Sequence, residues 1–172
     1  MDRVKCFMIE ETRQITQFVI CCSNKHRTVI ETVERSFEET KDDVIVWPSN
    51  CPQCGVSMVY DGKFEQGWNT RIGTRIWRQP ETGEEHIGLE EFGAGAMFDA
   101  SWLPWKGPDG LSLSVILPPG GQVDVWHIDG FAGGSDHRPW ERTGTPPNVT
   151  AKPSILTPRY HGFLTNGYLE SV

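Results

Sequence analysis

The turn CPQCG at residues 51–55 restricts the fold of this chain more than any other feature of its sequence. Two residues separate Cys51 from Cys54, and Gly55 follows directly. In zinc-binding knuckles, a turn of this kind directs two cysteine sulfurs toward one ion. A tetrahedral ion takes four ligands, so another segment of the chain must provide two more.

The stretch CCSNKH, which begins at Cys21, supplies two candidates for the missing ligands. Cys22 and His26 have the spacing C-x3-H, and CPQCG adds C-x2-C downstream. Two ligands on each of two hairpin-like turns is the arrangement of a zinc ribbon. The predicted metal ligands are therefore Cys22, His26, Cys51 and Cys54. A shift of one residue in strand register would put Cys21 in the place of Cys22, and the sequence leaves this choice open. The alternatives are a buried turn or redox pair for the downstream cysteines, and an exposed turn histidine for His26.

The predicted ligand set also indicates the kind of metal site. Three thiolates and one imidazole favour zinc over magnesium or calcium, which prefer oxygen ligands. Four protein ligands leave no open coordination position, and a closed zinc site is structural. The predicted cofactor is one Zn²⁺ that holds together strands with too little core of their own.

Charge and hydropathy restrict the location and the partners of the chain. Its formal net charge is −7 and its basic residues are scattered, which argues against a nucleic-acid partner. The densest charged run, residues 34–43, is mostly acidic and is interpreted as a solvated surface. We find neither a secretory leader nor an apolar stretch near the ~20 residues that span a membrane. A cytoplasmic protein is expected, whose five cysteines are thiols or metal ligands rather than disulfides.

Short stretches of β-branched and apolar residues predict a mainly β protein. Its 18 glycines and 12 prolines favour tight turns over long helices. Strands are predicted over residues 15–22, 28–33, 44–47, 56–60, 74–79, 111–117 and 122–129. One or two helical turns are expected over residues 84–92, and a long loop over residues 131–148.

Two antiparallel hairpins are predicted in the second half of the chain. LSLSVIL and QVDVWHID are joined by a glycine-rich turn, and Leu111, Leu113 and Val115 are expected to share one face. The second hairpin lies in RYHGFLTNGYLE, with its turn at Asn166 and Gly167. These two residue types tolerate the positive φ that a tight hairpin turn requires.

The predicted organisation has three parts. Residues 1–62 form a zinc-ribbon-like module, and residues 63–92 form a connecting segment. Residues 93–172 form an antiparallel β-rich domain, on which the module is expected to pack. The first boundary follows a DG turn signal, and the second marks a rise in glycine, proline and tryptophan.

Four polar residues of the second half are candidate functional residues. Alternation places His127 and Asp129 on one face of a strand, and His161 near them would complete an acid–base set or an open metal site. His137 lies in the long loop. The sequence contains no HExxH, GxSxG or phosphate-binding loop to support catalysis. The alternative for each histidine is a structural residue with satisfied hydrogen bonds.

Several motifs together resemble a family of small proteins from tailed bacteriophages and prophages. They are KCFMIE, CPQCG, GAMFDASW, WHIDG, and PPNVT followed by SI and YHGFLTNG, and they span most of the chain. The last motifs are also similar to a broader bacterial domain of unknown function. The resemblance implies that Cys51 and Cys54 are ligands and that a Cys-His pair precedes them, but it carries no activity. Many relatives have extra cysteines after WHIDG, where this chain has only His137 as a soft ligand.

Three kinds of function are compatible with these features. The main prediction is a non-enzymatic phage accessory protein, a zinc-stapled β scaffold that binds an unidentified host or phage protein in the host cytoplasm. The second is a component of the virion, such as a decoration protein. The third is a hydrolase-type enzyme that uses His127, Asp129 and His161.

Overall fold

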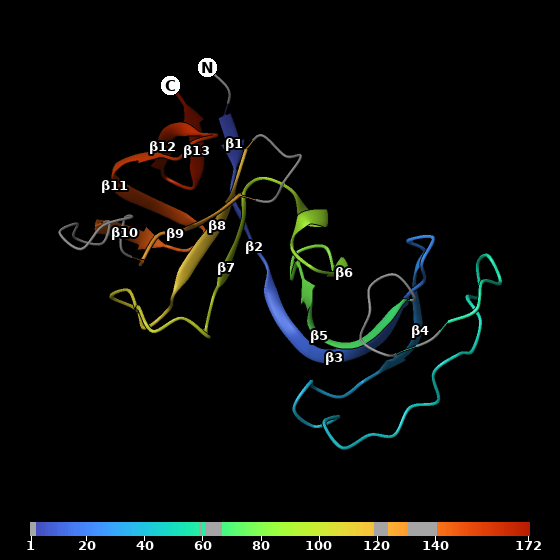
Figure 1. Ribbon diagram of the computed structural model, residues 1–172. Coiled ribbons are helices and arrows are strands. Elements are labelled where there is room, and N and C mark those ends of the chain that lie inside the picture. Colours follow the sequence, from blue (N-terminus) through green and yellow to red (C-terminus); the bar gives the residue numbers. More distant parts are fainter. Residues whose placement is uncertain (1–2, 59, 61–66, 119–123, 131–140) are drawn as a thin grey trace. The chain divides into compact units, whose positions relative to one another are not determined.

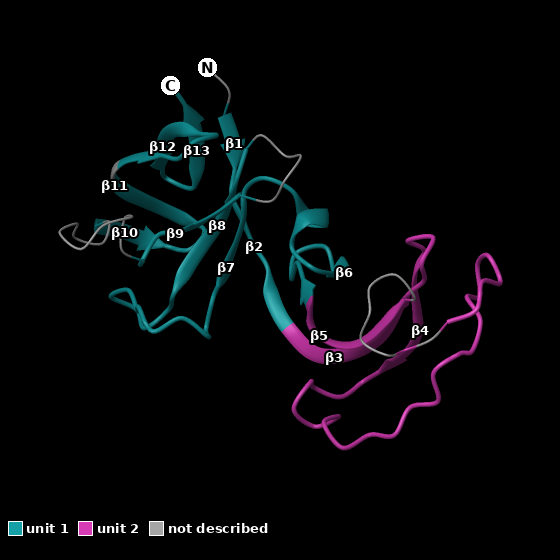
Figure 2. Ribbon diagram, in the orientation of Figure 1, with its two compact units in different colours: residues 1–11, 77–172 teal, residues 12–76 magenta. Residues whose placement is uncertain are grey.

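The computed structural model describes residues 3–58, 60, 67–118, 124–130 and 141–172. These residues form strands β1 to β13 and one short 3₁₀ helix, with no α-helix among them (Figure 1). The prediction of a mainly β protein is confirmed. Contacts divide the chain into two compact units, which are described separately below (Figure 2). The first unit comprises residues 1–11 and 77–172, and the second comprises residues 12–76. The linear boundaries predicted near residues 62 and 92 stay predictions.

The first unit contains a five-stranded antiparallel sheet in the order β1-β13-β12-β11-β10. Its strands are β1 (Arg3–Lys5), β10 (Glu141–Thr145), β11 (Asn148–Leu156), β12 (His161–Thr165) and β13 (Tyr168–Ser171). The first strand of the chain thus pairs with the last, with Arg3 opposite Glu170 and Val4 opposite Leu169 (Figure 1). Long-range pairing of this kind has no signature in a local sequence pattern.

The predicted hairpin at Asn166 and Gly167 is confirmed. β12 and β13 pair antiparallel, and Thr165 and Tyr168 flank the turn. Asn166 has φ 48° and Gly167 has φ 78°, as a two-residue hairpin turn with positive φ at both positions requires. Glycine is needed at the second position for a further reason: an added Cβ would lie 2.7 Å from the Pro147 carbonyl oxygen.

A four-stranded sheet in the order β2-β7-β8-β9 also belongs to the first unit. Its strands are β2 (Phe7–Met8), β7 (Ala96–Asp99), β8 (Leu113–Leu117) and β9 (Asp124–His127). β2 and β7 are parallel, whereas β7, β8 and β9 are antiparallel to their neighbours. Pairing of β8 with β9 confirms the first predicted hairpin. Leu113 and Val115 are fully buried in one core cluster, while Leu111 precedes the strand and is half-buried.

Both sheets of the first unit contribute to that core cluster. β8 supplies Leu113, Val115 and Leu117, and the five-stranded sheet supplies Leu164 and Leu169. These side chains are at most 1% exposed. Burial of large aliphatic side chains at this level stabilises a fold by about 1.5–3 kcal/mol each. The unit therefore has a core of its own that does not depend on a metal.

The second unit is built on the hairpin of β3 (Glu10–Cys21) and β4 (Arg27–Val33). This hairpin confirms the two strands predicted on either side of SNKHR. The strand order of this sheet is β4-β3-β5-β6, with β5 at Trp68–Arg78 and β6 at Glu85–Ile87. β6 itself belongs to the first unit. The division between the units falls inside β3 and β5. The strand predicted over residues 74–79 is the last part of the longer β5.

Four segment predictions are wrong in whole or in part. Residues 44–47 form no strand, and the described residues of the segment 56–60 contribute only an isolated bridge between Ser57 and Asn50. Strand propensity reflects fit to a pleated surface, and neither segment has a neighbouring ladder to complete. Residues 84–92 form β6 and a 3₁₀ helix (Glu90–Phe92), since Gly88 has a positive φ that interrupts a helix.

The long loop predicted over residues 131–148 is also wrong at its end, because residues 141–145 form β10. This strand is held by its antiparallel pairing with β11. Its sequence, ERTGT, buries only Arg142, so it has no apolar alternation that would indicate a strand. Residues 131–140 of the predicted loop lie outside the described residues.

Candidate metal centre

The turn between β3 and β4 carries the first two candidate ligands. Cys22 follows the last residue of β3, and His26 precedes the first residue of β4. The Cys22 N–H donates to the His26 carbonyl oxygen at 3.2 Å, and the Lys25 N–H donates to the Cys22 carbonyl oxygen at 2.8 Å. Lys25 adopts φ 63°, which reverses the chain within the turn. These hydrogen bonds hold both candidate ligands at the base of one tight turn.

The turn CPQCG carries the other two. The Cys51 N–H donates to the Val56 carbonyl oxygen at 2.8 Å, and the Gly55 N–H donates to the Cys51 carbonyl oxygen at 2.8 Å. Gly55 has φ 74°, a conformation that favours glycine, and an added Cβ would meet no atom there. The Gln53 N–H donates to the Cys51 sulfur at 3.4 Å. Hydrogen bonds from backbone N–H groups to a cysteine sulfur favour its thiolate form.

The two turns bring four ligand atoms into one group. Sulfurs of Cys22, Cys51 and Cys54 and a ring nitrogen of His26 all lie within 4.8 Å of one another. The sulfurs of Cys22 and Cys54 are 3.8 Å apart. A tetrahedral ion with bonds of about 2.3 Å to sulfur separates its sulfurs by about 3.8 Å. The group can therefore hold a metal ion, as the sequence predicts.

An unsatisfied polar atom in this group fits a metal ligand. The Nδ1 atom of His26 is buried and has no hydrogen-bond partner in the described part of the chain. Leaving a buried polar atom without a partner costs about 1–3 kcal/mol. A metal bound by this nitrogen would remove the cost.

The electrostatics of the group favour thiolates at its exposed edge. The Asn24 side-chain amide donates to the Cys54 sulfur at 3.5 Å and, with the Val56 backbone N–H and His26, lowers the pKa of Cys54 to about 6. Burial acts in the opposite direction at Cys22, whose thiol pKa is raised by desolvation. A bound cation would offset that desolvation, because it stabilises the deprotonated thiol directly.

The group contains Cys22 and not its neighbour. The Cys21 thiol is directed to the Cys22 carbonyl oxygen, with 3.7 Å between sulfur and oxygen. Cys21 pairs with Arg27 at the end of the β3–β4 ladder. This register places Cys22 at the first position beyond the ladder, where its sulfur reaches the second turn.

The second turn is held against the hairpin by contacts outside the ligand group. The Gln53 side-chain amide donates to the Arg27 carbonyl oxygen at 3.1 Å and to the Thr28 hydroxyl at 2.9 Å. A small apolar cluster lies beside the ligands and comprises Ile20, Cys22, Cys51 and Met58. Two of its four members are candidate ligands. The metal group is therefore part of this apolar cluster.

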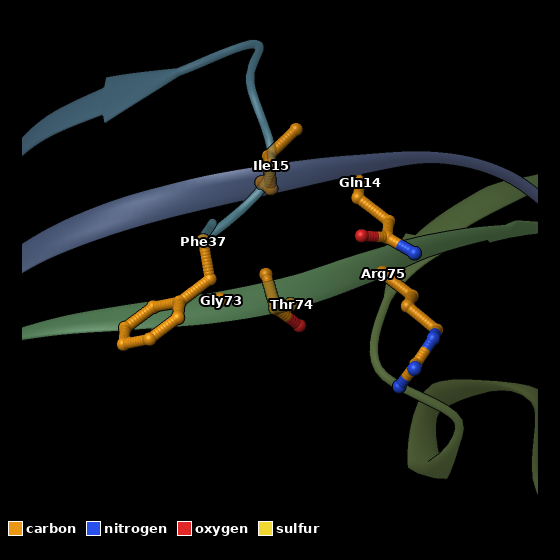
Figure 3. Close-up of a pocket in the computed structure, with 6 residues that line it drawn as sticks. All are labelled: Gln14, Ile15, Phe37, Gly73, Thr74 and Arg75. Atoms are coloured by element: carbon orange, nitrogen blue, oxygen red, sulfur yellow. The ribbon is translucent and has the colours of Figure 1, made fainter. Parts of the chain in front are cut away.

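A separate cavity of about 200 Å³ lies in the second unit (Figure 3). Its lining mixes the Phe37 ring with polar side chains of Gln14, Thr74 and Arg75. Arg71 stacks over the same ring at 4.0 Å from its centroid. The cavity shares no lining residue with the metal group.

The four functional candidates of the second half make different contacts. Nδ1 of His127 lies 2.7 Å from the hydroxyl of Ser114, which is fully buried, and desolvation lowers the pKa of His127. Asp129 accepts from the Leu113 N–H at 2.8 Å and from Arg142 Nε at 2.8 Å. His161 is an exposed residue of β12. His137 lies outside the described residues.

A buried ion network at Arg142 is absent from the sequence predictions. The Arg142 side chain is 2% exposed and binds both Asp129 and Asp109. Burial alone would lower the pKa of this guanidinium, but the two carboxylates overcome it and raise the pKa. The same arginine holds the pKa of Asp109 below its ordinary range. The three residues are distant in sequence and follow no recognisable spacing, so no local pattern indicates them.

Comparison with protein-family models, curated proteins and solved structures finds no significant match. In the described residues, no helix is long and apolar enough to cross a membrane.

Proposed function

We propose that this chain is a non-enzymatic bacteriophage accessory protein, a zinc-stapled β scaffold that binds a host or phage protein. The observation that carries the proposal is the convergence of three cysteine sulfurs and one histidine nitrogen within 4.8 Å. The phage origin rests on the sequence motifs alone. The protein partner is inferred from the absence of a catalytic motif in the sequence and from its acidic charge.

Zinc is the ion that these donors fit best. Three thiolates and one imidazole are soft to borderline ligands, and tetrahedral sites of this composition hold Zn²⁺. All four positions are filled by protein atoms, so no position remains for substrate or activated water. The ion would therefore stabilise the second unit instead of taking part in a reaction.

The contacts of the second half support a binding role over catalysis. Asp129 is occupied by Arg142 and by the Leu113 N–H, which leaves it poorly placed to act as a base. The hydroxyl beside His127 belongs to Ser114, which is fully buried and out of reach of a substrate. Each of these polar residues has the satisfied hydrogen bonds of a structural group.

Cross-linking of a tagged chain in infected cells, followed by mass spectrometry of the captured proteins, tests the proposal. The matched control is the double variant Cys51→Ser/Cys54→Ser, which removes one of the two ligand turns. We expect one or a few host or phage proteins with the parent chain and their loss with the variant. Equal recovery from both chains, or hydrolase activity in the purified protein, would contradict the proposal. Mass spectrometry of purified particles separates an accessory protein from a virion component, since only the latter is present in them.

A further inference from the structure

Residues 44–47, VIVW, display an apolar stripe that none of the described residues covers. Val44 is 94% exposed and Val46 is 91% exposed. Ile45 and Trp47, which alternate with them, are half-buried. This two-residue alternation is that of a strand with one side packed and the other side open.

The segment has the composition of a strand and lacks a strand partner. It belongs to no β-ladder with the residues that the structure describes. Its β-branched and aromatic residues are those most enriched in strands. Unpaired backbone N–H and C=O groups beside such side chains are a template for an added strand from another chain.

Aromatic contacts hold one end of the segment in place. The Trp47 ring lies between Phe18 and Tyr60, at centroid distances of 6.1 and 6.2 Å. The Tyr60 hydroxyl donates to the Pro48 carbonyl oxygen at 2.7 Å. The first cysteine of the ligand turn, Cys51, follows three residues after Pro48. Because this end is fixed before binding, less conformational entropy is lost when a partner strand is added.

Charge identifies the kind of partner. The preceding residues 34–43 contain five acidic and two basic side chains. Asp42, two residues before Val44, is exposed. Arg35 already neutralises Asp43 by pairing with it, so the attraction for a basic segment comes from the exposed Asp42 and from the remaining negative charge of the run. The chain has a net charge of −7, so two copies would repel each other, whereas a basic partner would be attracted.

We propose that residues 44–47 bind an extended segment of a partner protein, with apolar residues at alternate positions and lysine or arginine between them. The segment pairs its backbone with that of residues 44–47, and its apolar side chains cover Val44 and Val46. Its basic side chains face the acidic run at 34–43. This inference rests on the proposed function, because it names the surface and the chemistry through which the scaffold binds.

The test uses the full chain, loaded with zinc, and two synthetic peptides. One peptide alternates valine with lysine, and the other alternates valine with glutamate. We expect the lysine peptide to bind at least about tenfold more tightly than the glutamate peptide at low salt. The affinity for the lysine peptide should fall as salt is added. Hydrogen exchange of the amides of residues 44–47 should slow on binding. Equal affinity for both peptides, or protection confined to other residues, would overturn the proposal.

Three variants localise the effect. Val44→Ser/Val46→Ser should lower the affinity for the lysine peptide by about tenfold, because this double variant removes the apolar stripe without changing the charge. Asp42→Asn should lower the affinity for the lysine peptide by a smaller factor, and should reduce the dependence of this affinity on salt. Val172→Ser is the matched control, since Val172 is 73% exposed in the other unit, and its affinity should equal that of the parent.

Further measurements separate this proposal from the proposed function. A light-scattering dimer that disappears in Val44→Ser/Val46→Ser would assign the stripe to a second copy and overturn the hetero-partner. Cross-linked partners that persist in that variant would leave the scaffold function standing and reject this surface. A chain without zinc that still binds the lysine peptide at residues 44–47 would reject the zinc-stapled scaffold and retain this surface.

Discussion

The sulfur atoms of Cys22 and Cys54 lie 3.8 Å apart, although the two residues are 32 positions apart in the sequence. Two turns, each closed by its own backbone hydrogen bonds, produce this proximity. Two thiols at this distance repel one another once both are ionised, unless a cation lies between them. The arrangement leads to the first prediction, on metal content.

Protein purified without added metal should contain about one zinc per chain. A strong chelator should remove this zinc. The cysteine sulfurs that held it should then react with a thiol reagent, because they are no longer bound to metal. Elemental analysis and a thiol titration before and after chelation make the measurement. A zinc content near zero, with the exposed thiol of Cys54 equally reactive before and after chelation, would contradict the metal site.

Cys22→Ser should lose the metal, whereas Cys21→Ser should retain it. Only Cys22 belongs to the ligand group, while the neighbouring thiol is directed to a backbone carbonyl. Structural zinc contributes about 10–16 kcal/mol in small zinc-binding peptides, so the loss should exceed the ~1 kcal/mol of an average substitution.

Hydrogen exchange resolves the effect of Cys22→Ser along the chain. Protection should fall in residues 12–76 and persist in the first unit, whose core clusters contain none of the ligands. Zinc content equal in both cysteine variants, or loss in Cys21→Ser alone, would show that the register is read incorrectly.

Asp129→Ala should destabilise the protein by about 3–5 kcal/mol, because it leaves the buried Arg142 guanidinium without one of its partners. The double variant Asp129→Leu/Arg142→Met should recover much of this loss, since it removes both buried charges. Denaturant unfolding measures the free energies. Equal stability of Asp129→Ala and the parent would show that the ion pair is not buried in solution.

The Asp109 carboxylate should make the stability of the protein depend on pH in the acidic range. Arg142 lowers the pKa of Asp109 in the folded state below its ordinary value of 3.8. The resulting stabilisation is present above the unfolded pKa and is lost as the pH falls toward and through the folded pKa. Thermal unfolding from pH 7 to pH 2 should show a smaller acid-dependent loss in Asp109→Asn. Parallel curves for the two chains would contradict this contribution.

Gly167→Ala should destabilise the chain more than Gly83→Ala. Both glycines have positive φ, at which an alanine costs about 1–2 kcal/mol. An added Cβ at Gly167 would also lie 2.7 Å from the Pro147 carbonyl oxygen, whereas at Gly83 it would meet no atom within 4 Å. Thermal melting of the two variants compares these costs. Equal melting temperatures would show that the chain around Pro147 yields without cost.

Local turn chemistry explains which parts of the fold could be predicted. The spacing of Cys22, His26, Cys51 and Cys54 reports two short turns, and the structure brings these residues together. The turn of the β12–β13 hairpin could likewise be predicted, because asparagine and glycine tolerate the positive φ that it requires.

Pairing between residues distant in sequence explains most of the features that could not be predicted. VIVW has strand propensity, but propensity does not supply a neighbouring strand. ERTGT lacks that propensity and becomes β10 through its ladder with β11. Burial of Arg142 depends on two carboxylates brought to it by the folded sheets. None of these outcomes is encoded in the residues adjacent to the segment concerned.

The pairing of β1 with β13 sets an order of events during synthesis. Arg3 is translated 167 residues before its partner Glu170. Residues 12–76 are translated between them as an unbroken stretch, whose four candidate ligands can meet a metal ion before β13 is made. The first unit is interrupted by this stretch and closes only after translation reaches β13. The supply of metal should therefore affect the folding of residues 12–76, whereas the speed of translation should affect the closure of the first unit.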